Sequence, residues 1–109
     1  MIKQTALNMV KHVVFFRLLD EAEGKSKAEN ARIIRDGLLA LREKIDVLRS
    51  EEVGINIPNA PRTDYDLCLT CTFDRWEDLD TYQFHPEHQK VAAYIGLCKS
   101  SRAAVDYEY

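Results

Sequence analysis

The run over residues 64–73 limits the possible folds of this chain more than any other feature. Tyr, Leu, Cys or Phe occupies every second position there, and Asp, Cys or Thr occupies the positions between. A period of two is typical of a β-strand whose two faces meet different surroundings. Pro58 and Pro61 come shortly before the run and predict a loop. We therefore predict a strand over residues 64–73, reached through a loop.

Three further segments, residues 10–18, 47–57 and 100–109, are also predicted to be strands. The first is rich in β-branched and aromatic residues, and both of its alternating faces carry apolar side chains. His12 and Phe16 share one face with Val14 and Leu18, whereas Val13 and Phe15 lie on the other. This pattern predicts a central strand covered on both sides. Gly54 marks a possible β-bulge in the second segment.

Three helices complete the pattern. Ser26 and Glu29 have the spacing of a capping box, which predicts a helix over residues 26–45. A second helix is expected over residues 75–84, with Trp76 and Leu79 in the core. His85 precedes Pro86, and a residue before proline disfavours the helical conformation, so a new helix should begin at Pro86 and run to about residue 98.

The resulting order, β-α-β-β-α-α-β, predicts an α+β domain with a four-stranded antiparallel sheet of the split βαβ type. All helices would cover one sheet face, and the other face would expose Val13 and Phe15. Because an exposed apolar sheet usually marks an interface, we predict a homodimer whose sheets pack face to face.

Length and composition point to one domain over residues 9–109 after a short extension at residues 1–8, where Met9 is an alternative start. The net charge of −3 offers no basic excess for nucleic acid. No run approaches the roughly 18 apolar residues that a membrane span needs.

Three cysteines without a recognisable signal peptide favour free thiols and a cytoplasmic location. Cys68 and Cys71 should lie on opposite sheet faces, which favours packing over a redox or zinc role.

Two of the three histidines, His85 and His88, flank the Pro86 break, and His12 lies on the first strand. His88 falls at the third helical position, on a stripe shared with Val91 and Ile95 that faces inward. Burial and the positive end of the helix dipole both disfavour an imidazolium there. We therefore expect a neutral imidazole at pH 7, which is suited to act as a general base.

Four segments of the chain resemble the stress-responsive A/B barrel family, Dabb. They are residues 10–14 (VKHVV), 73–79 (FDRWEDL), 82–88 (YQFHPEH) and 105–107 (VDY). The likeness covers nearly all of residues 9–109. It implies a dimeric α+β barrel of ferredoxin-like subunits.

The family includes a plant polyketide cyclase, and this likeness implies roles for three residues. His88 would be the general base, Tyr82 would stabilise developing negative charge, and His12 would form a hydrogen bond within the site. The cyclase also has a tyrosine on its first helix. Residues 26–45 contain no tyrosine, so the likeness does not carry over the cyclase's substrate.

Two functional hypotheses follow. In the first, the chain is a cofactor-free enzyme, of cyclase or isomerase type, that acts on a small apolar carbonyl compound through His88, Tyr82 and His12. In the second, the same residues form a buried polar cluster in a non-catalytic dimer that binds a small hydrophobic molecule or protects under stress. A bound metal is not expected, because His85 and His88 should point in different directions. The pocket would be lined by His85, Phe16, Ile34, Leu38 and Val91.

Overall fold

The computed structural model describes residues 9–109; residues 1–8, the expected extension, lie outside the described residues. The chain alternates strands and helices in the predicted order, with one small hairpin added after the first strand. The elements are β1 (Val10–Leu18), β2 (Glu21–Ala22), β3 (Lys25–Ser26), α1 (Lys27–Ala40), the 3₁₀ turn η2 (Leu41–Glu43), β4 (Ser50–Ile55), β5 (Leu67–Phe73), α2 (Trp76–Phe84), α3 (Pro86–Cys98) and β6 (Lys99–Glu108).

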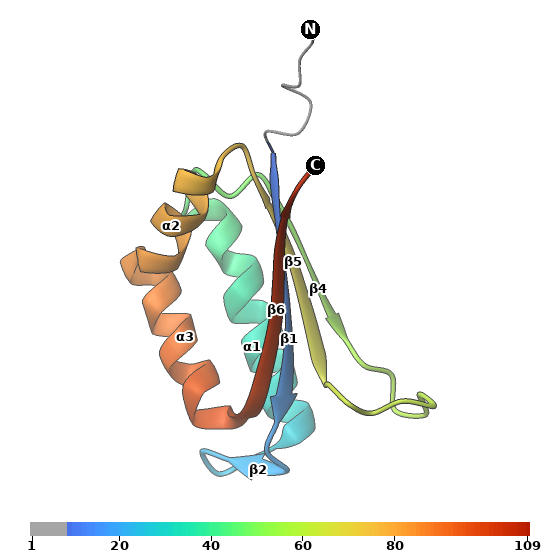
Figure 1. The fold of residues 1–109 in the computed structure, drawn as a ribbon. Helices are drawn as coiled ribbons and strands as arrows, with labels where there is room; N and C mark the ends of the chain where they lie inside the picture. The colour runs from blue at the N-terminus through green and yellow to red at the C-terminus, as the bar shows by residue number, and fades with distance from the viewer. Residues whose placement is uncertain (1–8) are drawn as a thin grey trace, which may run out of the picture.

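The main sheet has the strand order β4-β5-β1-β6, and every neighbouring pair is antiparallel. The helices form a single layer on one face of this sheet (Figure 1). This is the ferredoxin-like α+β arrangement that the sequence predicted, with β1 in the interior of the sheet. The small β2-β3 hairpin, in contrast, lies between the first strand and the first helix, where the sequence predicted no strand.

The predicted capping box begins α1. The Glu29 backbone N–H donates to the Ser26 hydroxyl at 3.2 Å, and the Ser26 N–H donates to the Glu29 carboxylate at 3.1 Å. Regular α-helix ends at Ala40, earlier than the apolar period suggested, because η2 tightens the chain after it. The inner side of this segment, including Ile34 and Leu38, is buried against the sheet.

Two local expectations were wrong. Gly54 pairs directly with Cys68 in an unbroken β4-β5 register, and the irregularity lies instead between Arg17 and Leu18 on the β1-β6 ladder. Trp76 is 44% exposed, because it stands at the first turn of α2 and its indole N–H donates to Glu108 at the end of β6. Leu79 is buried as expected.

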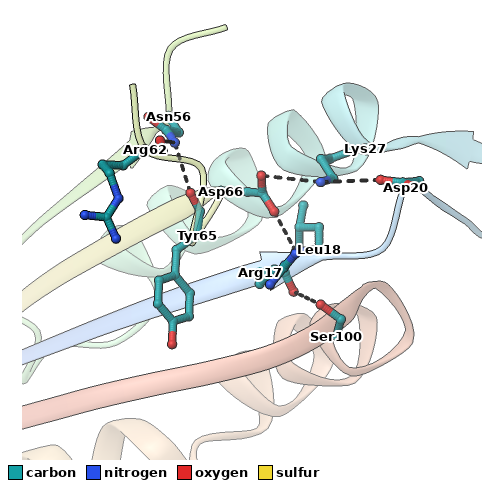
Figure 2. Close-up of polar contacts among 9 residues, drawn as sticks. All are labelled: Arg17, Leu18, Asp20, Lys27, Asn56, Arg62, Tyr65, Asp66 and Ser100. Atoms are coloured by element: carbon teal, nitrogen blue, oxygen red, sulfur yellow. Dashed lines mark hydrogen bonds and ion pairs between the residues drawn. The ribbon is translucent and has the colours of Figure 1, made fainter. Parts of the chain in front are cut away.

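The connection over residues 56–66 extends away from the helical layer, beyond the end of β4 (Figure 1). Its base is held by side chain to backbone bonds. The Asn56 amide donates to the carbonyls of Arg62 and Tyr65 at 3.0 and 3.1 Å. Asp66 accepts from the Leu18 N–H at 2.8 Å and lies 3.6 Å from the Lys27 ammonium (Figure 2). These bonds join the long connection to the end of β1 and the start of α1.

The sheet face opposite the helices, here called the open face, carries side chains from β1, β5 and β6. It includes Val13, Phe15, Cys68, Val105 and Tyr107, which the strand pairing places on one side. Val105 is 57% and Tyr107 42% exposed. Within residues 9–109, no helix is long and apolar enough to cross a membrane.

Candidate active site

A row of four ionisable side chains crosses the helix-facing side of the sheet at one register. Glu51 on β4 pairs with Cys71 on β5, Cys71 pairs with His12 on β1, and His12 pairs with Asp106 on β6. Directly paired residues project from the same sheet face. Cys68 therefore lies on the open face, three residues from Cys71, which confirms the predicted separation of the two thiols. Tyr82 of α2 lies next to Cys71 and His12, whereas Glu51 lies beside Leu39 of α1 and Arg42 of η2.

His12 is held at one end of this row by Asp106. The His12 Nδ1 forms a hydrogen bond with the Asp106 carboxylate, and the His12 side chain is only 3% exposed. A carboxylate on one ring nitrogen fixes the tautomer and orientation of an imidazole and leaves Nε2 for other partners. Sequence reasoning missed Asp106, although it lies in a segment shared with the family, because the antiparallel register of β1 and β6 was unknown.

Glu51 lies at the opposite side of the row, without a bonding partner. Both of its carboxyl oxygens are buried and lack a hydrogen bond within the described part of the chain. Burial raises the pKa of Glu51 to about 7, against the influence of neighbouring Arg42. Sequence reasoning missed this residue, although Glu51 alternates onto the same face of the edge strand β4 as the apolar Val53 and Ile55.

His88 is placed by the Pro86 break as the sequence predicted. His85 is the N-cap of α3, and its Nδ1 accepts from the Glu87 N–H at 3.1 Å. The His88 ring packs on the Tyr82 ring with 4.5 Å between centroids, and its Nδ1 is buried without a hydrogen-bond partner among residues 9–109.

Burial lowers the pKa of His88, and the nearby His12, Arg102 and His85 add to the effect, whereas the Gln83 backbone opposes it. The direction agrees with the expected neutral imidazole.

Tyr82 lies between the two histidines but inside the core. It is fully buried, with ring centroids 5.2 Å from Phe73, 4.5 Å from His88 and 6.5 Å from His12. Its hydroxyl accepts from the Cys71 thiol at 3.8 Å. Burial raises the pKa of Tyr82 far above its usual range, so the phenol keeps its proton. The structure thus brings His12, Tyr82 and His88 together.

A cavity of about 110 Å³ lies between the sheet and the helices, next to both histidines. Its lining comes from β1, α1, β5, α3 and β6 and the end of α2. The lining residues are His12, Val14, Phe16, Leu38, Leu69, Gln83, His88, Ala92, Ile95, Lys99 and Arg102.

Some of the predicted pocket residues line this cavity and others do not. Phe16 and Leu38 do. Ile34 is in the core with 1% exposure, and Val91 packs on α1 close to Gly37. His85 serves as the cap of α3 rather than as part of the lining, and the Tyr82 hydroxyl is likewise outside it.

Lys99 and Arg102 give the cavity a positive side that the sequence did not reveal. Both belong to β6, and neither forms an ion pair with any of residues 9–109. In the same range, no three His, Cys, Asp or Glu side chains are grouped as metal ligands. The cavity therefore combines two imidazoles, two cations and an apolar wall.

These observations define a ferredoxin-like α+β domain with a small, histidine-lined cavity between sheet and helices. The chain belongs to the stress responsive A/B barrel domain family, Dabb, which matches residues 10–109. No curated protein sequence matches it.

Solved structures agree with this assignment. A dimeric protein of unknown function from Bacteroides fragilis is 36% identical, with a TM-score of 0.83 over 97% of this chain and 98% of the other. A dimeric ferredoxin-like protein from Thermobifida fusca is 22% identical, with a TM-score of 0.79 and coverages of 94% and 92%. The hydroxynitrile lyase from Passiflora edulis is 18% identical, with a TM-score of 0.74 and 94% of each chain covered. The last two structures have the same fold as this chain.

Proposed function

We propose that this chain is a cofactor-free enzyme that removes a proton next to the carbonyl group of a small molecule, as a cyclase or isomerase does. One observation carries the proposal: His88 lines the cavity, its buried Nδ1 has no bonding partner among residues 9–109, and burial lowers its pKa. A neutral, partly buried imidazole is the usual general base near pH 7. A hydroxynitrile lyase of the same fold shows that the fold is compatible with catalysis.

In the proposed step, His88 takes the proton and the C–H electron pair moves onto the carbonyl oxygen, giving an enolate. Return of that proton to another atom of the substrate completes an isomerisation, so neither oxidant nor cofactor is needed. His12, fixed by Asp106, orients the substrate from the other side of the cavity. The family likeness gives Tyr82 the role of oxyanion donor. Because its hydroxyl faces Cys71, we propose that Tyr82 chiefly positions the His88 ring.

The test is exchange of the protons next to the carbonyl group in deuterated buffer, followed by NMR on a panel of small ketones and oxo acids. A positioned general base contributes about 10²–10⁴-fold, so His88→Gln should slow exchange by about a hundredfold or more. Lys90→Gln, an exposed change two residues away on α3, is the matched control. Equal exchange by wild type and His88→Gln would contradict the proposal.

A second candidate function is a non-catalytic dimer that binds a small molecule or protects under stress. The full burial of Tyr82 and its bond with Cys71 favour it, because they are features of a structural polar cluster. Under this function His88→Gln lowers the melting temperature, and no carbonyl compound shows catalysed exchange.

We also propose that the chain forms a homodimer through its open face. That face exposes Val105 and Tyr107 beside Val13 and Phe15, which are only partly buried although Tyr65 packs on the Phe15 ring. Three related structures are described as dimeric ferredoxin-like proteins. Packing two such faces together would bury the apolar side chains that each chain leaves exposed.

A further inference from the structure

Two unpaired cations lie at the same cavity as the two histidines, an arrangement that an apolar ligand would not need. Arg102 and Lys99 line it, and no carboxylate of residues 9–109 forms an ion pair with either. Other cations of the chain are held by carboxylates; Lys27, for example, lies 3.5 Å from Asp20 and 3.6 Å from Asp66 (Figure 2). The positive side of the cavity is therefore available to a ligand anion.

The size of the cavity limits that ligand. Its volume is about 110 Å³, and an apolar cavity of about 150 Å³ is known to hold benzene. The enclosed part of a ligand should therefore comprise about four non-hydrogen atoms, fewer than the six of benzene. Phe16, Leu38 and Leu69 offer apolar contacts, and the two cations offer charge. A short carbon chain with one terminal anion fits both requirements.

Arg102 lies near His88, the proposed base. Its positive charge acts on His88 and helps to lower the pKa of that imidazole. A guanidinium binds a carboxylate through two parallel hydrogen bonds and fixes its orientation. An anion held there would place the remainder of a short molecule beside the histidines.

We propose that the cavity takes a small carbonyl compound that carries a carboxylate, a short-chain oxo acid, with Arg102 and Lys99 holding the carboxylate. This inference rests on the proposed function and narrows its substrate class. The carbonyl lies toward His12 and His88, and the methylene or methyl group between carbonyl and chain end is the proton donor. Arg102 is a binding residue in this scheme.

The test compares a charged probe with its neutral counterpart. Acetoacetate and methyl acetoacetate differ mainly in the carboxylate, and their binding can be followed through the NMR signals of the histidine ring protons. The wild-type chain should bind acetoacetate about tenfold more tightly or better than the ester, since a charge-assisted hydrogen bond is worth a decade of affinity or more. Arg102→Gln should remove the preference. Arg35→Gln, an exposed arginine on α1 paired with Asp36, should keep it.

Thermal melting confirms that each variant is folded before binding is compared. Equal affinity for acid and ester, or an unchanged preference in Arg102→Gln, would overturn the inference. Failure of the proposed function can be distinguished from failure of this inference. If acetoacetate binds in an Arg102-dependent way but 2-oxobutyrate and the ketone panel show no His88-dependent exchange, the anion site stands without the chemistry. If neutral ketones exchange as fast as oxo acids, the chemistry stands without the anion site.

Discussion

The two faces of the sheet differ in what covers their apolar side chains. On the helix-facing side, β1 and β5 contribute Val14, Phe16 and Leu69, and the chain's own helices cover them. On the open face the same strands contribute Val13 and Phe15, which are only partly covered. Alternation along a strand thus divides its residues between a core that the chain makes alone and a surface that requires a partner. The histidine cavity belongs to the first of these.

Val14→Glu is the strongest test of this comparison. Val14 is 1% exposed beneath the helices, and glutamate there would overfill the packing and remove a carboxylate from water; Lys99 and Arg102, which line the same cavity, would offset only part of that cost. Burying a charge in this way costs several kcal/mol, which is comparable to the roughly 5–15 kcal/mol that stabilise a domain. The variant should have no cooperative thermal transition at pH 8, measured by circular dichroism. A transition within a few degrees of wild type would show that this face is not a closed core.

Val13→Glu makes the same chemical change one residue away and should have a different result. Two-fold symmetry would place both new carboxylates in the dimer interface, with a cost of a few kcal/mol each. Light scattering at micromolar concentration should give the mass of one chain, with the helical circular dichroism retained.

Leu97→Glu is the control for Val13→Glu. Leu97 is a 55% exposed residue on α3, away from the open face, and this variant should remain dimeric. A monomeric wild type, or a dimer that survives Val13→Glu, would refute the proposed interface.

The same division explains what could be predicted from the sequence. Strand β1 and the boundaries of α3 follow from local signals, namely alternation over residues 10–18 and the Pro86 break, and both were predicted correctly. The contact of Tyr82 with His88 could also be predicted from the sequence, because the two residues flank that break. Trp76 was misplaced because a nine-residue helix defines its buried side poorly, and the first-turn indole projects to Glu108 instead.

The parts of the site that were missed depend on register between distant strands. Asp106 reaches His12 only because β6 pairs with β1 in one particular alignment, and 94 residues separate the two in sequence. The same alignment brings Arg102 and Lys99 to the cavity. A single residue of slip would send all three to the open face. Val105 and Tyr107 alternate with Asp106 and Glu108, but this local pattern does not say which residue of β1 each one meets, so the charged side of the cavity emerges only from the fold.

The smallest effect is expected for a change at Glu51. This polar residue lies on the helix-facing side of the sheet, where apolar residues are expected. Its folded-state pKa is about 7, above the ordinary 4.5. A raised carboxyl pKa gives stability that is fully present below pH 4.5 and is lost as the pH rises through about 7. Glu51→Gln stays neutral throughout. It should therefore match wild type near pH 4.5 and exceed its stability at pH 8 by about 1–2 kcal/mol, allowing for partial solvent screening.

Thermal melts at one fixed protein concentration measure this difference, which corresponds to roughly 4–8 °C per kcal/mol for a domain of this size. Glu52→Gln, the exposed neighbour on the other side of β4, should show no such gain. Identical pH profiles for Glu51→Gln and wild type would mean that the carboxylate is solvated despite its position. A gain would mean that the chain keeps an ionisable group under its helices at a cost to its own stability. Groups kept at such a cost are typical of functional sites, and Glu51 would then join His12 and Asp106 as part of one functional row across the sheet.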